Sequence, residues 1–229
     1  MYWKKWIPKD SSEMALIILI IGFAFIIGST FLFIEIADDI LEDEKFYIDQ
    51  VVQDVMESAR DTWFHSLMET ITELGSVPIL TIATIVLVSY LFLFKKRKWE
   101  AIFFGINMVG ISLLTKGLKL IFQRDRPEIL MQYDGTGFSF PSGHSTGSIA
   151  FYGFCIYLVA RSRWKSRTKW LCNSVLSLLI VLIPLSRTVL SVHYFTDVLA
   201  GVSLGLAWLL VCIFGLQILL WRRRHHHFN

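Results

Sequence analysis

Six long apolar runs, separated by polar connections, constrain this 229-residue chain more than any other feature. A helix needs about 20 apolar residues to cross the hydrocarbon core of a bilayer, and several of the runs approach that length. Charged residues make up 18% of the sequence, below the roughly 25% of soluble domains. The sequence therefore predicts an all-α integral membrane protein, a single domain over 1–229, built as a bundle of six transmembrane helices at about 14–36, 77–94, 101–122, 146–160, 170–185 and 196–221.

Basic residues gather on alternate connections and indicate the orientation of the bundle. They lie in 2–9, 95–98, 161–169 and 222–227, which six spans would place on one side of the membrane. The connection 38–61 carries nine Asp or Glu residues against one Lys and one Arg, and it would fall on the other side. Under the positive-inside rule, both termini are cytoplasmic. We interpret 222–227, which includes three histidines, as part of a basic cytoplasmic tail that meets acidic lipid.

Apolar residues also recur at helical spacing between the first and second spans. The pattern over 51–74 predicts one amphipathic helix that lies on the outer surface of the membrane and leads into the second span.

Three polar clusters would meet at the outer face of this bundle. They cover 119–127 at the end of the third span, 140–145 at the start of the fourth, and 186–197 between the fifth and the sixth. Ionisable groups at membrane depth are costly, so they indicate a functional site. The positive-inside rule predicts few basic residues on the outer side of the membrane, yet these clusters carry four. Cations at such a place suggest a bound anion such as phosphate. The four are Lys119, Arg124, Arg126 and Arg187.

The residue types in these clusters indicate phosphoryl transfer. Ser142 and Gly143 precede the fourth helix, where free backbone N–H groups and the positive end of the helix dipole favour phosphate. We expect His193 to start the sixth helix, so that Asp197, four residues later, shares its face and can hydrogen-bond to it. His193 could then attack phosphorus, and His144 could protonate the leaving oxygen.

The cations would stabilise the phosphoryl oxygens during this reaction. We expect Arg124 to contribute less than the others, since with Asp125 it could form a surface ion pair.

The same residues allow functions other than phosphoryl transfer. The two histidines and Asp197 could ligate a metal, but four nearby cations would repel one, and the sequence has no HExxH motif or acidic ligand cluster. We therefore predict no metal and no other cofactor. A lipid-phosphate binding or transport protein, which would use the cations only to hold phosphate, remains open as a different class of function.

The three clusters resemble the signature of the type 2 phosphatidic acid phosphatase superfamily, which reads K-x6-RP, PSGH and SR-x5-H-x3-D. In this chain 119–127, 141–144 and 186–197 match the three parts in order and without departure. The six-span layout is also similar to that of the family's membrane members. The resemblance implies a metal-independent phosphatase in which His193 forms a phosphohistidine, Asp197 is its partner and His144 is the general acid. It also implies a set of phosphate-binding residues, namely Lys119, Arg126, Ser142, Gly143 and Arg187.

The substrate is expected to be a lipid phosphate, because the clusters would lie at the level of the lipid headgroups. Short loops and the lack of an N-x-[ST] site suggest a bacterial plasma membrane, with the site on its extracellular or periplasmic side. The family includes enzymes of the phosphatidylglycerophosphatase B type, which act on phosphatidylglycerophosphate, and others that act on undecaprenyl pyrophosphate. The motifs do not separate these substrates, and we favour the first. No nucleic acid and no obligate protein partner is expected.

Overall fold

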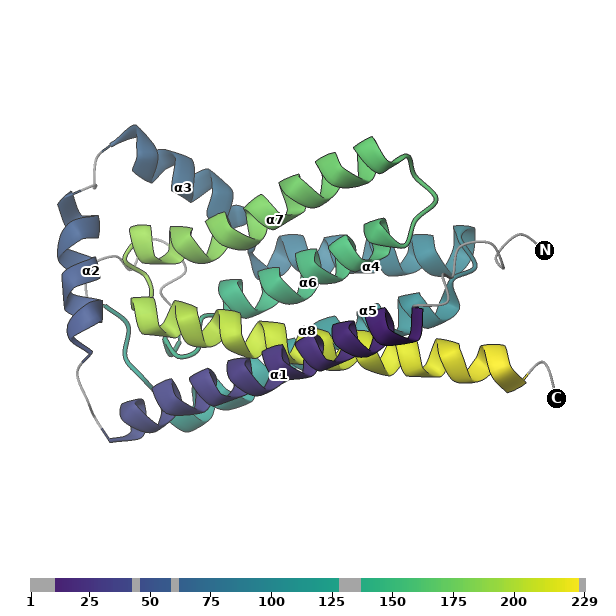
Figure 1. The fold of residues 1–229 in the computed structure, drawn as a ribbon. Helices are drawn as coiled ribbons and strands as arrows, with labels where there is room; N and C mark the ends of the chain where they lie inside the picture. Colours follow the sequence, from purple (N-terminus) through teal and green to yellow (C-terminus); the bar gives the residue numbers. More distant parts are fainter. Residues whose placement is uncertain (1–10, 43–45, 59–61, 128–136, 227–229) are drawn as a thin grey trace.

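The computed structural model is a bundle of long helices with two shorter helices at one end (Figure 1). The structure describes residues 11–42, 46–58, 62–127 and 137–226, and within these ranges it contains helices and no strands. The prediction of an all-α fold is confirmed, since each apolar run lies within or overlaps a helix. The long helices are α1 (Ser11–Leu41), α4 (Val77–Ser89), which continues through a π-helical turn (Tyr90–Phe94), α5 (Lys98–Phe122), α6 (Gly143–Ala160), α7 (Ser166–Val189) and α8 (Phe195–His226).

Within the residues that the structure describes, five helical segments are long and apolar enough to cross a membrane, so the chain is a multi-pass membrane protein. They are Leu19–Leu41, Val77–Phe94, Lys98–Phe122, Ser166–Val189 and Phe195–Arg224. Helix α6 is not among them, although it runs along the bundle with the others. It packs against α4, α5, α7 and α8, and its first two turns bury polar side chains. Because α6 is enclosed by other helices, it does not need the continuous apolar surface that lipid requires.

Small residues and aromatic rings bring α6 close to its neighbours. Phe104 of α5 packs edge-to-face against Phe154 of α6, with ring centroids 5.2 Å apart. On the other side, Gly201 of α8 lies against the start of α6, where a Cβ atom would meet the carbonyl oxygen of Ser142 at 2.8 Å. The absence of a side chain at Gly201 therefore lets α8 approach the PSGH turn closely.

The single amphipathic helix predicted over 51–74 is wrong in detail, because the chain forms two helices there. These are α2 (Tyr47–Ser58) and α3 (Trp63–Glu73). Thr62 has an extended backbone, with φ −94° and ψ 160°, which does not allow one continuous helix. Helix α2 lies across the end of the bundle and packs against α7 and α8, whereas α3 runs back along α7 to the start of α4 (Figure 1).

The long helices alternate in direction, which places the connections at two opposite ends. The end of α1, the end of α5, the start of α6 and the α7–α8 turn lie at the end that α2 covers (Figure 1). The α4–α5 and α6–α7 connections lie at the opposite end, together with the start of α1 and the end of α8. The three polar clusters of the sequence therefore meet at the end covered by α2.

Candidate active site

The predicted histidine and aspartate are brought together in the turn between α7 and α8. His193 Nδ1 lies 3.5 Å from Asp197 Oδ2, and the exposed fractions of the two residues are 3% and 0%. The expectation that His193 starts the last helix is wrong, because α8 begins at Phe195. Ser191 adopts a left-handed backbone (φ 52°), which turns the chain between the two helices before His193. The contact with Asp197 therefore joins a turn residue to the first turn of α8.

Ser139, which the sequence analysis did not identify, lies between these two side chains. Its hydroxyl donates to Asp197 Oδ2 at 2.5 Å, and its oxygen lies 3.1 Å from His193 Nδ1. Because the serine proton is given to the carboxylate, the serine oxygen accepts the proton of Nδ1. The His193 ring is thereby assigned the Nδ1–H tautomer, which leaves a lone pair on Nε2.

Burial keeps the His193 ring neutral. It lowers the pKa of His193 to about 3, although the hydrogen bond and the charge of Asp197 act in the opposite direction, and Arg187 and Arg126 lower the pKa further. Near pH 7 the ring is therefore unprotonated on Nε2, as a nucleophile must be.

Arg124 differs most from the sequence prediction, which placed it in no more than a surface ion pair with Asp125. Its Nη1 donates to Asp197 Oδ1 at 2.6 Å, and its Nη2 donates to Asp49 Oδ2 at 2.9 Å. Asp49 belongs to α2, is 3% exposed, and also accepts the backbone N–H and the hydroxyl of Thr196 at 2.9 and 2.7 Å. Arg124 thus links two buried carboxylates instead of lying at the surface.

The three cations of the family signature lie around the His193–Asp197 pair. Lys119 donates to the carbonyl oxygens of Phe138 and Ser139, the latter at 3.2 Å. Arg126 Nη1 donates to the carbonyl oxygen of Val192 at 3.2 Å, directly before His193. Arg187, which is 1% exposed, donates from Nη1 to the hydroxyl of Thr72 in α3 at 2.9 Å. These bonds orient the three cations, and they identify Thr72 as a further residue that the sequence did not reveal.

The start of α6 only partly matches the expected phosphate cradle. The backbone N–H of Ser142 donates to the carbonyl oxygen of Asp197 at 3.1 Å, so this N–H group is not available to an anion as predicted. The side chain of Ser142 caps α6 by accepting from the backbone N–H and the hydroxyl of Ser145 at 3.4 and 3.0 Å. Gly143 and His144 form the first turn of α6, where N–H groups lack intrahelical acceptors. The helix N-terminus can therefore contribute to an anion site from Gly143 onward.

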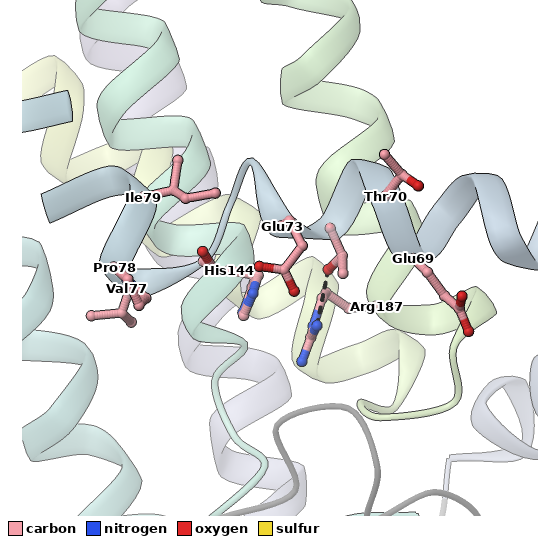
Figure 2. Close-up of a pocket in the computed structure, with 10 residues that line it drawn as sticks. Glu69, Thr70, Glu73, Val77, Pro78, Ile79, His144 and Arg187 are labelled. Carbon is pink, nitrogen blue, oxygen red and sulfur yellow. Dashed lines mark hydrogen bonds between the residues drawn. The ribbon is translucent and has the colours of Figure 1, made fainter. Parts of the chain in front are cut away.

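Two cavities reach the signature residues from different sides. The first, which we call the polar cavity, has a volume of about 780 Å³ and is lined by His144 and Arg187 together with Glu69, Thr72 and Glu73 of α3 (Figure 2). The second, which we call the apolar cavity, has a volume of about 500 Å³ and lies among α4, α5 and α6. Lys119 and Gly143 line it together with aliphatic side chains, which include Leu80, Ile85, Met108, Val109, Ile111 and Leu113. Hydroxyl side chains (Thr81, Thr84, Ser112, Thr115 and Thr146) and Lys116 complete the lining with Gly75, Val77 and Gly147.

The turn between α3 and α4 separates the two cavities and packs against His144. Val77 lines both cavities. A Cβ atom on Gly75 would lie 2.3 Å from Ile183 Cγ2 and 3.3 Å from His144 Cδ2. The lack of a side chain at Gly75 therefore allows this turn to sit directly beside the His144 ring.

Comparisons with known proteins show which family this chain resembles. Residues 100–220 match the model of the PAP2 superfamily. Phosphatidylglycerophosphatase B of Bacillus subtilis (strain 168) is 31% identical over 159 residues, which cover 69% of this chain and 78% of that relative.

Two solved structures share the fold. The transmembrane PAP2 type phosphatidylglycerolphosphate phosphatase from Bacillus subtilis superimposes with a TM-score of 0.71 at 27% identity, over 82% of this chain and 93% of that one. LpxE of Aquifex aeolicus gives a TM-score of 0.58 at 22% identity, over 74% of this chain and 97% of that one, and supports the fold alone. The chain therefore belongs to the PAP2 superfamily, as one of its membrane phosphatases.

Proposed function

We propose that the protein hydrolyses phosphatidylglycerophosphate to phosphatidylglycerol and inorganic phosphate, without a metal, through a phosphohistidine. The observation that carries this proposal is the buried His193–Asp197 pair, in which Nε2 of the ring is left with its lone pair and the charges of Arg126 and Arg187 act on the ring. Similarity to phosphatidylglycerophosphatase B supports the choice of substrate.

In the first step His193 acts as the nucleophile. Its Nε2 forms a bond to phosphorus while the bond between phosphorus and the lipid oxygen breaks, and His144, which the negative charge of the bound phosphate allows to be protonated, gives its proton to that leaving oxygen. Asp197 and Ser139 hold the proton on Nδ1 and stabilise the positive charge that the ring acquires. In the second step the oxygen of a water molecule forms a bond to phosphorus while the bond between phosphorus and His193 Nε2 breaks. His144 takes a proton from the water, His193 returns to its neutral form, and inorganic phosphate leaves.

The signature cations stabilise the phosphoryl oxygens in both steps. We assign this role to Lys119, Arg126 and Arg187, with Gly143 at the N-terminus of α6. Each of the three cationic side chains is oriented by at least one hydrogen bond to the protein, which limits the rearrangement needed when phosphate binds. Ser142 contributes by capping α6.

The apolar cavity supports a lipid substrate. It borders Lys119 and Gly143, and the aliphatic side chains of its walls belong to α4 and α5, two helices long and apolar enough to cross the membrane. An acyl chain could occupy it while the phosphate reaches the cations, so the substrate would enter sideways from the bilayer.

The polar cavity favours a phosphomonoester over a diphosphate. Glu69 and Glu73 face the same cavity as His144, the proposed acid for the leaving oxygen (Figure 2). Carboxylates can accept hydrogen bonds from a hydroxylated headgroup such as glycerol. The leaving group of undecaprenyl pyrophosphate is itself a phosphate, which these carboxylates would repel. We therefore keep undecaprenyl pyrophosphate as the second candidate.

We further propose that the six long helices all cross the membrane, with both termini in the cytoplasm and the site at the outer face. The alternation of helix directions supports this arrangement. The basic connections 95–98 and 161–169 lie at the end opposite to the site, whereas the acidic helix α2 covers the site.

Phosphate release from purified protein in detergent with EDTA tests the proposed function. We expect release from phosphatidylglycerophosphate in EDTA, and a loss on the order of 10³-fold or more in His193→Ala, because the nucleophile is removed. Equilibrium binding of the substrate by His193→Ala is measured in parallel. Activity that requires a divalent metal, or that survives in His193→Ala, would contradict the mechanism. No release by the wild-type protein together with tight binding would indicate a binding or transport protein instead.

Glu73→Gln tests the choice between monoester and diphosphate. Removing this charge should raise kcat/KM for undecaprenyl pyrophosphate relative to phosphatidylglycerophosphate by about threefold or more, as expected for a partly screened charge. Asp54→Asn is the matched control, since Asp54 is an exposed carboxylate of α2 that does not line the polar cavity. An unchanged ratio in Glu73→Gln, or an equal change in Asp54→Asn, would remove this argument for the monoester.

Cysteine labelling in intact cells tests the orientation. In a variant without the natural cysteines, Asp54→Cys in α2 should react with a membrane-impermeant maleimide in whole cells. Lys165→Cys, beside the start of α7, should react only after the membrane is permeabilised, because we place it in the cytoplasm. The reverse pattern would invert the proposed topology, and equal labelling of both positions in intact cells would refute a six-span arrangement.

A further inference from the structure

We infer that Arg124 is a positioning residue for the His193–Asp197 pair and that Asp49 of α2 holds Arg124 in place. This inference rests on the proposed function, because it assigns a role in that reaction. It concerns a residue inside the K-x6-RP segment that the signature itself leaves unspecified, and a carboxylate that lies outside every signature motif.

The geometry of Asp197 gives the two carboxylate oxygens different partners. Oδ1 accepts from Arg124 Nη1 at 2.6 Å. Oδ2 accepts from the Ser139 hydroxyl at 2.5 Å and from the backbone N–H of Tyr194 at 3.0 Å, and it is the oxygen nearest to His193. By holding Oδ1, Arg124 fixes the rotation of the carboxylate, and Oδ2 is thereby directed at the imidazole.

Arg124 is itself held on several sides, which makes it a rigid support. Its Nη1 also donates to Thr196 Oγ1 at 2.8 Å, and its Nη2 donates to Asp49 Oδ2 at 2.9 Å. Its guanidinium carbon lies 4.2 Å from the ring centroid of Tyr194 and 5.6 Å from that of Phe46. Such a clamp suits a planar guanidinium and cannot be reproduced by an ammonium group.

The charges make Arg124 necessary for this arrangement. Asp49 and Asp197 are both buried carboxylates, with exposed fractions of 3% and 0%, and Arg124 is in an ion pair with each. If the guanidinium were removed, two buried negative charges would lose a shared cation. In that case we expect Asp197 to move or to take up a proton. Either change would weaken the interactions that hold the proton on Nδ1 of His193, so the Nδ1–H tautomer would no longer be favoured.

This network gives α2 a part in the reaction. Helix α2 lies across the end of the bundle, and Asp49 is the residue through which it reaches Arg124 and Thr196. The surface helix therefore acts on the nucleophile through Asp49, which holds Arg124 and Thr196, and not by contact with the phosphate.

Kinetics of single and double variants test the inference. In Arg124→Gln we expect kcat for phosphatidylglycerophosphate to fall at least about tenfold, but less than the roughly 10⁴-fold loss seen when the orienting carboxylate of a serine protease is changed. KM should stay within about threefold, because Arg124 does not bind the phosphate. Arg124→Lys should also lose kcat, since an ammonium cannot hold both carboxylates. It serves as the second variant if Arg124→Gln does not fold.

The double variant separates positioning from independent effects on folding. Asp49→Asn should lower kcat less than Arg124→Gln does, and combining the two should add no more than about a twofold further loss, because Asp49 acts through Arg124. Arg97→Gln is the matched control, since it breaks an arginine–carboxylate pair with Glu100 (3.0 Å) at the opposite end of the bundle, and its kcat should not change.

A spectroscopic readout distinguishes failure of this inference from failure of the proposed function. ¹⁵N spectra of histidine-labelled protein should show the Nδ1–H tautomer of His193 in the wild-type protein and its loss in Arg124→Gln. An unchanged tautomer, an unchanged kcat, or a rise in KM alone would overturn the inference. If the wild-type protein releases no phosphate from any lipid, the proposed function fails, and the spectra still decide whether Arg124 positions His193.

Discussion

The buried carboxylate of Asp197 is the constraint on which the rest of the site depends. A charge with no exposed surface is tolerated only when hydrogen bonds and an opposite charge surround it. Its partners come from three parts of the chain: Arg124 after α5, Ser139 before α6, and the backbone of Tyr194 before α8. Satisfying this one group therefore fixes the ends of three helices relative to one another, and His193 is positioned as a consequence.

In the proposed function, the two cavities would hold different parts of the substrate in contrasting environments. The apolar cavity borders lipid-crossing helices and suits an acyl chain, whereas the polar cavity exposes carboxylates to the side where the leaving group would depart. The Gly75 turn separates them beside His144. This arrangement places the proposed acid at the boundary between the lipid and its headgroup, where the scissile bond of a lipid phosphate would lie.

The sequence predicted the long helices, and the signature residues lie together at one end of the bundle, but the sequence did not predict the partners that hold these residues. The length of an apolar run and the alternation of charge between connections are properties of the sequence itself, so they indicate membrane-spanning helices such as α5 and α8 directly. Asp49, Thr72 and Ser139 act through tertiary contacts that no spacing reveals. Asp49 did leave one signal, because it shares a helical face with Val52 and Met56 and so is a carboxylate on the buried side of α2. Asp125, the sequence neighbour of Arg124, suggests a surface ion pair, whereas the actual partners of Arg124 lie more than 70 residues away along the chain.

Trapping the covalent intermediate would test the central claim most directly. His144→Ala should slow hydrolysis of the phosphohistidine, and an aryl phosphate, whose leaving group needs no proton, should still phosphorylate the protein. After an alkaline quench, which preserves phosphohistidine, mass spectrometry would locate the phosphate. We predict that it is bound to His193 and absent from His193→Ala. Turnover with phosphate on another residue, or with no phosphorylated protein in His144→Ala, would contradict the account.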